Sequence, residues 1–249
     1  MSEILLNKRR VLVTGSARGL GEGFARALVA AGARVVLSDV LHERGRALAA
    51  ELGEAARYVP MDLSDPADIA RGVAEAAQCW GGLDGLVNNG AVTDSGGRMA
   101  DEIDIGTWDR VMQVNVRGTW LMTRACHAAL AASGRGAIVN LASDTALWGA
   151  PRLLAYVASK GAVIAMTRSL ARELGADRIT VNALAPGLVE VEATQYVPAE
   201  RHAHYIDQRA LHRPQLPEDV SGVVVWALSD LARFVTGQTL AVNGGFVMH

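Results

Sequence analysis

The sequence predicts an α/β fold in which helices cover both faces of a doubly wound, parallel sheet. Short runs rich in β-branched residues alternate with longer amphipathic runs along most of the 249 residues. The strand runs, such as VLV at 11–13 and VVL at 35–37, are continuously apolar, which is typical of strands buried on both faces. Strands of this kind that alternate with helices predict repeated βα units.

Glycines divide the first half of the chain into elements. RRVLVTG is a strand that ends at Gly15, and the Ala- and Leu-rich GLGEGFARALVAAGA is a helix that ends at Gly32. RVVLSDV is the second strand, and Gly53 stops the helix HERGRALAAELG that follows it. ARYVPMD is the third strand, a helix covers about 66–80, and DGLVNNG is the fourth strand.

The second half continues the alternation. A long helix over about 107–132 precedes the fifth strand, GAIVNLAS, and the next helix runs to about residue 174. RITVNALAP, an irregular stretch, a helix near 217–229 and QTLAVNGG complete the chain. No Pro/Ser-rich linker or charge run interrupts this order. We therefore expect a single domain over 1–249, with a substrate loop at about 188–215.

Composition and charge exclude several function classes. The net charge of −2 lacks the basic footprint of a nucleic-acid-binding protein. No apolar run reaches the roughly 18 residues that span a bilayer, and the N-terminus MSEILLNKRR does not resemble a secretory signal. Cys79 and Cys126 lie in apolar helical stretches, as buried thiols of a reducing compartment do. We expect a cytoplasmic protein that binds neither nucleic acid nor membrane.

The first strand-to-helix turn, VTGSARGLGEG, predicts a dinucleotide site. Gly15, Gly19 and Gly21 allow the backbone to approach a pyrophosphate, and the helix that begins there directs free N–H groups at it. A glycine spacing alone is weak support. This one follows a strand and opens a helix, as the motif requires.

Two residues bear on the choice between NAD and NADP. Asp39 ends the second strand, where a carboxylate accepts hydrogen bonds from the ribose hydroxyls and repels a 2′-phosphate. Arg18, next to Gly19, can either meet a 2′-phosphate or be an ordinary exposed loop arginine. Asp39 carries more weight, because a carboxylate at the ribose excludes a phosphate whereas an arginine only permits one. We therefore expect NAD, with NADP as the lesser alternative.

Polar residues end the next two strands. Asp62 and Leu63 end the third, where an adenine contact and a turn-capping aspartate remain equally open interpretations. NNG at 88–90 ends the fourth, and its amides either tie loops together or contact a ligand in the crevice beyond the sheet.

Tyr156 and Lys160, four residues apart in LAYVASKGAV, lie on one face of a helix. An ammonium beside a phenol favours the phenolate, so we expect Lys160 to lower the pKa of Tyr156 from ~10 towards neutrality. Tyr156 would then act as general acid and base, with Ser143, at the end of the fifth strand, hydrogen-bonding the same substrate oxygen. Asn115 interrupts an amphipathic helix, which indicates a specific partner, and we expect it to bind a proton-relaying water. Taken one at a time, these residues also have structural explanations: Ser143 as a cap, Tyr156 as a core residue with a satisfied hydroxyl, and Lys160 as a surface residue that snorkels.

Taken together, these motifs resemble the short-chain dehydrogenase/reductase family over nearly the whole chain: TGxxxGxG at 14–21, NNG at 88–90, Asn115, Ser143, Tyr156 with Lys160, and Pro186 with Gly187. The resemblance implies a Rossmann-type sheet of about seven strands, a nicotinamide cofactor and a catalytic tetrad of Asn115, Ser143, Tyr156 and Lys160. It further implies that Lys160 bonds the nicotinamide ribose and that the protein is a homotetramer or homodimer.

The chain departs from the family pattern at three places. NNGA at 88–91 replaces NNAG, Asn243 replaces an aspartate, with the expected loss of a turn bond, and Val191 stands where a threonine often bonds the carboxamide. We expect Thr194 to take that last role. The residues expected to hold the cofactor are Gly15, Arg18, Gly19, Leu20, Gly21, Asp39, Asp62, Leu63, Asn89, Gly90, Tyr156, Lys160, Pro186, Gly187, Val189 and Thr194.

The loop after the sixth strand is expected to close over an apolar mouth. The residues expected to contact the substrate are Ser143, Trp148, Leu153, Tyr156, Leu188 and Tyr196, with Val189 and Tyr205 as further candidates. The direction of Glu190 and Glu192 in this loop stays open. A weak basic cluster follows, either a solvated helix face or a surface for an acyl carrier protein: Arg201, His202, His204, Arg209, His212 and Arg213. His202 and His204 diverge on a helix, so no metal site is expected.

The leading hypothesis is an oxidoreductase that transfers a hydride between a nicotinamide cofactor and a small, hydrophobic or aromatic secondary alcohol or ketone, with Tyr156 as general acid and base. An NADPH-dependent 3-oxoacyl-thioester reductase is the alternative within enzymes. A non-catalytic cofactor-binding regulator is a third hypothesis, and the intact tetrad argues against it.

Overall fold

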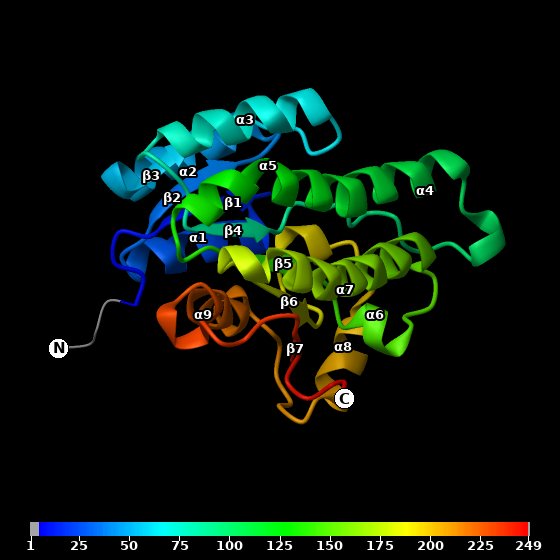
Figure 1. Ribbon diagram of the computed structural model, residues 1–249. Coiled ribbons are helices and arrows are strands. Elements are labelled where there is room, and N and C mark those ends of the chain that lie inside the picture. The colour runs from blue at the N-terminus through cyan, green and yellow to red at the C-terminus, as the bar shows by residue number, and fades with distance from the viewer. Residues whose placement is uncertain (1–4, 249) are drawn as a thin grey trace.

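The computed structural model describes residues 5–248, so the two ends of the expected domain, 1–4 and 249, lie outside the described residues. Seven parallel strands form one sheet in the order β3-β2-β1-β4-β5-β6-β7 (Figure 1). The strands are β1 (Arg10–Thr14), β2 (Arg34–Ser38), β3 (Ala56–Tyr58), β4 (Gly85–Asn88), β5 (Ala137–Leu141), β6 (Thr180–Pro186) and β7 (Thr239–Val242). The predicted fold class is confirmed.

Helices cover both faces of the sheet (Figure 1). Successive side chains of a strand point to opposite faces. In β1, Val11 and Val13 pack with α1 and α9, whereas Leu12 packs with α3, α5 and α7. The helices are α1 (Gly19–Ala30), α2 (His42–Leu52), α3 (Pro66–Gln78), α4 (Ile105–Met112), α5 (Thr119–Ala132), α6 (Thr145–Trp148), α7 (Leu154–Leu174), α8 (Ala199–Gln208) and α9 (Pro217–Ala227).

The helix expected over 107–132 is not continuous. A π-helical turn, Gln113–Gly118, separates α4 from α5. The turn widens at Asn115, whose side chain bonds to the backbone of Val92, outside the helix. A Cβ added to Gly118 would lie 2.8 Å from the carbonyl oxygen of Leu63, so only glycine allows the turn to approach the loop after β3 this closely.

The segment expected to be irregular after β6 contains α8, and α6 is a further short helix that sequence patterns did not indicate. In Figure 1, α8 and the C-terminal segment lie next to each other. Tyr205 of α8 stacks on Phe246 of that segment, with ring centroids 4.2 Å apart. Cys79 and Cys126 are free thiols; Cys126 is buried, and burial raises its pKa to about 12.

A buried carboxylate links three strands at their N-terminal ends, opposite to the strand ends that carry the glycine turn. Asp84, just before β4, accepts hydrogen bonds from the backbone N–H of Arg10 (2.9 Å), from Arg10 Nε (2.8 Å) and from Arg135 Nε (3.0 Å). Burial works to raise the pKa of Asp84, but the hydrogen bonds from the two arginines outweigh it and hold that pKa at about 2. The carboxylate therefore binds more tightly to its surroundings than the neutral acid does.

We predict that Asp84→Asn lowers the free energy of unfolding by about 2 kcal/mol at pH 7. A group whose pKa is depressed on folding stabilises the protein above its unfolded pKa of ~3.9 and loses that effect as the pH falls through its folded pKa. The loss should therefore shrink between about pH 4 and about pH 2. Urea denaturation across this range measures it, with the exposed Asp101→Asn as control. An equal loss at every pH would contradict this assignment.

Candidate active site

The glycine-rich turn after β1 forms one wall of a cavity of about 420 Å³. Gly15 and Gly19 have φ values of 62° and 58°, the left-handed region that favours glycine. A Cβ added to Gly21 would lie 2.0 Å from the carbonyl oxygen of Gly15. α1 begins at Gly19, and Arg18 supplies no side-chain cap, so the first N–H groups of the helix remain available to an anion.

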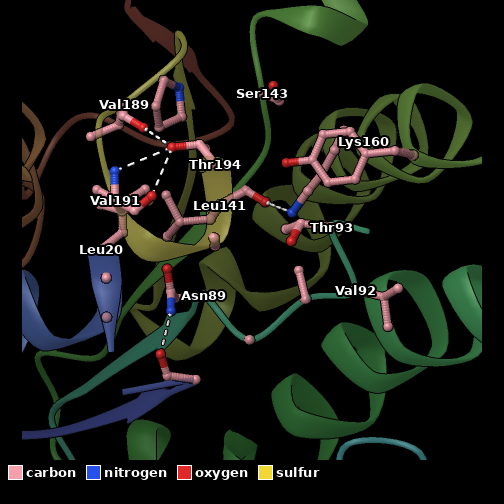
Figure 2. Close-up of a pocket in the computed structure, with 18 of the residues that line it drawn as sticks. Leu20, Asn89, Val92, Thr93, Leu141, Ser143, Lys160, Val189, Val191 and Thr194 are labelled. Carbon is pink, nitrogen blue, oxygen red and sulfur yellow. Dashed lines mark hydrogen bonds between the residues drawn. The ribbon is translucent and has the colours of Figure 1, made fainter. Parts of the chain in front are cut away.

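Amide and hydroxyl side chains hold this turn against the end of β4. Asn89 Nδ2 donates to the carbonyl oxygens of Thr14 and Gly15, both at 2.9 Å, and one of these bonds is visible in Figure 2. Thr14 Oγ1 accepts from the N–H groups of Asn89 (3.1 Å) and Gly90 (3.0 Å). A Cβ added to Gly90 would lie 2.7 Å from Leu63 Cδ1, so the altered NNGA order keeps a small residue where one is needed.

Asp39 lines the end of the cavity that follows β2. Its side chain is fixed by two backbone groups: Oδ2 accepts from Ala17 N–H and Oδ1 from Leu41 N–H, each at 2.9 Å. Asp62 also lines the cavity, and its Oδ1 accepts from Ser64 N–H at 2.8 Å, so the turn-capping role and the position for an adenine contact coexist.

Ser143, Tyr156 and Lys160 line the same cavity. Lys160 is only 4% exposed, and its Nζ donates to the carbonyl oxygen of Leu141 at 2.6 Å, as Figure 2 shows. The same Nζ lies 5.5 Å from the centroid of the Tyr156 ring. Tyr156 and Lys160 of α7 therefore lie near the end of β5. Lys160 bonds to Leu141, the last residue of β5, and Tyr156 lines the cavity together with Ser143, two residues further on.

Asn115 has a different position from the one expected. Its Oδ1 accepts from Val92 N–H (2.7 Å), and its Nδ2 donates to Val92 O (3.0 Å) and Ser159 Oγ (3.1 Å). It does not line the cavity. The side chain therefore ties the π-helical turn to the loop after β4 and to α7, and the expected binding of a water by Asn115 stays a prediction.

The surroundings of the Tyr156 phenol shift its pKa in the opposite direction from the expected one. Burial raises the pKa of Tyr156, and the Ser143 hydroxyl only partly opposes this. Burial also lowers the pKa of Lys160 to about 8. The expected shift of the Tyr156 pKa towards neutrality is wrong for the protein by itself, because burial of the phenol dominates and Lys160 donates its hydrogen bond to Leu141.

The end of the cavity expected to take the substrate is lined by the residue before α7, by α8 and by the loop after β6. Leu153, Leu188, Tyr196 and Tyr205 line it. Trp148 does not: its Nε1 donates to Tyr205 Oη at 3.3 Å, and its ring meets Tyr205 edge-on from behind the wall. The expectation that Trp148 lines the cavity is corrected accordingly: its indole packs on Tyr205, which lines the cavity instead.

Sequence reasoning missed Asp144, which lines the cavity directly after Ser143 and is buried. Its Oδ1 accepts from Tyr205 Oη at 3.1 Å, whereas Oδ2 has no hydrogen-bond partner within residues 5–248. Burial raises the pKa of Asp144 to about 7. A charged residue immediately after an apolar strand and a candidate catalytic serine was the available signal.

The loop after β6 holds itself in place around Thr194. The Thr194 hydroxyl donates to Val189 O (2.7 Å) and accepts from Val191 N–H (3.2 Å), as drawn in Figure 2. Asn243 keeps a turn bond, since its Oδ1 accepts from Gly245 N–H at 3.1 Å, so the expected loss is corrected.

The basic residues of the loop do not form one patch. Arg209 is buried and donates to Leu188 O, and Arg213 is paired with Asp219 at 2.6 Å. Asn115 and Trp148 are the expected site residues that do not line the cavity. The expected residues that line it are Gly15, Arg18, Gly19, Leu20, Gly21, Asp39, Asp62, Leu63, Asn89, Gly90, Ser143, Leu153, Tyr156, Lys160, Pro186, Gly187, Leu188, Val189, Thr194 and Tyr196.

These residues fit a nicotinamide dinucleotide. The glycine-rich turn and the uncapped start of α1 suit a pyrophosphate, Asp39 suits a ribose, and Tyr156 and Lys160 stand at the expected reacting end. Among residues 5–248, no helix is long and apolar enough to cross a membrane. Over the same residues, no three metal-ligating side chains gather in one place.

Comparison with known proteins shows the family to which the chain belongs. The family model described as enoyl-(acyl carrier protein) reductase matches residues 15–247. The chain is 41% identical over 236 residues to a 3-alpha-(or 20-beta)-hydroxysteroid dehydrogenase of Mycobacterium tuberculosis, covering 95% of this chain and 88% of that protein.

Two solved structures are also similar. One is a short-chain type dehydrogenase/reductase from Mycobacterium ulcerans, with a TM-score of 0.93 and 32% identity over 97% of this chain and 90% of that one. The other is a 3-ketoacyl-(acyl-carrier-protein) reductase from Brucella melitensis complexed with NADH, with a TM-score of 0.90 and 33% identity over 98% and 100%. The chain is an NAD(P)-dependent dehydrogenase that acts on CH–OH groups, and it belongs to the short-chain dehydrogenase/reductase family.

Proposed function

We propose that the protein is an NAD-dependent dehydrogenase of hydrophobic secondary alcohols, which it interconverts with the corresponding ketones. The observation that carries this proposal is the convergence of Ser143, Tyr156 and Lys160 in the cavity that the glycine turn also lines. An assay of reduced nicotinamide formation across a panel of alcohols, with NAD and with NADP, tests it.

In this proposal, each residue has a defined task. The Tyr156 hydroxyl exchanges a proton with the substrate oxygen, and Ser143 hydrogen-bonds that oxygen and holds it in reach. Lys160 supplies positive charge next to the Tyr156 ring. Asn115 joins the π-helical turn between α4 and α5 to Ser159 of α7 and so holds α7 in position. A bound nicotinamide ring supplies the hydride acceptor.

The position of Asp39 supports NAD over NADP. Its carboxylate is anchored between two backbone N–H groups and lines the cavity after β2. A 2′-phosphate, with about −1.5 to −2 charge, would meet this carboxylate at close range.

The lining of the substrate end supports a hydrophobic substrate. Leu153, Leu188, Tyr196 and Tyr205 give it a largely apolar and aromatic wall. The similar hydroxysteroid dehydrogenase carries a substrate class of the same character in its name. The similar 3-ketoacyl-(acyl-carrier-protein) reductase keeps a 3-oxoacyl-thioester reductase as the second candidate. A 3-oxoacyl thioester in the same panel distinguishes the two.

We propose further that the enzyme is a cytoplasmic homotetramer or homodimer. Ile105 and Trp120 on α4 and α5, and Leu231 and Phe234 after α9, expose large apolar side chains, which supports assembly. Free thiols at Cys79 and Cys126 are consistent with a reducing compartment.

We predict that Tyr156→Phe lowers kcat by a factor of about 10² to 10⁴, because the proton donor is removed while the ring stays in place. NAD should still bind with its dissociation constant changed less than about threefold, as measured by fluorescence titration. Turnover that persists in this variant would refute the acid/base role of Tyr156.

We predict that Asp144→Asn shifts the pH profile of alcohol oxidation to lower pH. Asp144 ionises as the pH rises through about 7, and its negative charge raises the pKa of Tyr156. The other charged and titratable groups that face Asp144 are Tyr205 and Arg209. Removing the charge should move the acid limb of kcat/KM down by about one pH unit. Asp207→Asn, on the exposed side of α8, is the control, and an unmoved or upward-shifted limb contradicts the prediction.

We predict that Tyr196→Ala raises KM for bulky hydrophobic alcohols about tenfold, because it removes a large aromatic contact from the cavity wall. The dissociation constant of NAD should stay nearly constant. Trp148→Phe, behind the wall, should change the substrate profile less. Steady-state kinetics on the alcohol panel measures both, and an unaltered profile for Tyr196→Ala would count against the proposed mouth.

A further inference from the structure

Three charged side chains from distant segments meet at the rim of the cavity. Glu192, in the short 3-10 helix Glu192–Thr194 after β6, accepts from Arg18 Nη1 at 2.9 Å through Oε1. Its Oε2 accepts from Arg44 Nη1 at 2.7 Å. One carboxylate of the substrate loop thereby bridges the glycine turn and the first turn of α2.

Both arginines belong to the segments that hold Asp39. Ala17, which donates to Asp39 Oδ2, directly precedes Arg18. Leu41, which donates to Asp39 Oδ1, is the residue before α2, and Arg44 lies three residues further on. Arg18 itself lines the cavity. Arg18 and Arg44 therefore belong to the two segments whose backbone N–H groups hold the carboxylate proposed to bind the adenosine ribose.

The charges at this rim determine how strongly it attracts the 2′-phosphate of NADP. A 2′-phosphate binds best to guanidinium groups that offer paired N–H donors. Here Glu192 already occupies a donor of each arginine and adds a negative charge of its own. The Arg44 and Arg18 hydrogen bonds hold the pKa of Glu192 below its usual range.

We propose that Glu192 is a specificity-determining residue that disfavours NADP by occupying Arg18 and Arg44 beside Asp39. This inference rests on the proposed preference for NAD and gives the substrate loop a part in the choice of cofactor. Asp39 repels the phosphate directly, and Glu192 withholds the two cations that would otherwise attract it.

The test is direct binding of NAD and NADP to the full-length chain, measured by isothermal titration calorimetry without substrate. In Glu192→Gln, the dissociation constant of NADP should fall about five- to tenfold, while that of NAD changes less than about twofold. The gain should shrink as salt is added, since the three side chains are exposed.

Glu190→Gln is the matched control. Glu190 lies two residues earlier in the same loop, is exposed, and has no ion-pair partner within residues 5–248. It should leave both dissociation constants unchanged. A variant that combines Glu192→Gln with Arg18→Ala and Arg44→Ala should lose the gain for NADP, because the freed guanidinium groups are then absent.

The inference is overturned if Glu192→Gln leaves the ratio of the two dissociation constants at its original value. It is equally overturned if Glu190→Gln produces the same gain, or if the gain survives loss of both arginines. An unmodified protein that binds NADP more tightly than NAD refutes the proposed cofactor preference instead, and the change caused by Glu192→Gln still decides the role of Glu192.

Discussion

The buried ammonium of Lys160 is the constraint on which the reacting end of the cavity depends. A charged group is costly to bury without a partner, and Lys160 finds one in the carbonyl oxygen of Leu141, at the last residue of β5. Because α7 is held there, Tyr156 stands one helical turn earlier, beside Ser143, which follows β5 by two residues. This hydrogen bond is one of the contacts that hold α7 against the end of β5, where Tyr156 and Ser143 both line the cavity.

The same edge of the sheet joins the reacting end to the substrate loop. Asp144, directly after Ser143, accepts a hydrogen bond from Tyr205 of α8, and the Tyr205 ring stacks on Phe246 of the C-terminal segment. At the other end of the loop, Glu192 reaches the glycine turn and α2. The segment after β6 is therefore held at both ends of the cavity. Aromatic rings hold it at the end expected to take the substrate, and charged side chains hold it at the end expected to take the cofactor.

The sheet, the glycine turn and the residues at the strand ends could be predicted because each depends on local pattern and on the common edge where parallel strands end. The position of Asn115 could not: its partner, Val92, lies 23 residues away, and only the fold brings the two together. Trp148 packs on Tyr205 and Phe246 and does not line the cavity, and these partners lie too far along the chain for a local pattern to indicate them. The pKa of Tyr156 was misjudged because spacing places Lys160 beside the ring but says nothing of burial, which dominates.

The proposed mechanism requires the Tyr156 phenol to become acidic enough to exchange a proton with the substrate oxygen once NAD occupies the cavity, with Lys160 supplying charge that favours the phenolate. An ultraviolet difference titration of tyrosinate in the NAD complex, compared between the unmodified protein and Lys160→Met, tests this most directly. The account predicts one tyrosine that ionises below the ordinary ~10 in the unmodified protein and at higher pH in Lys160→Met. Identical titrations, with every tyrosine at or above the ordinary value, would contradict it.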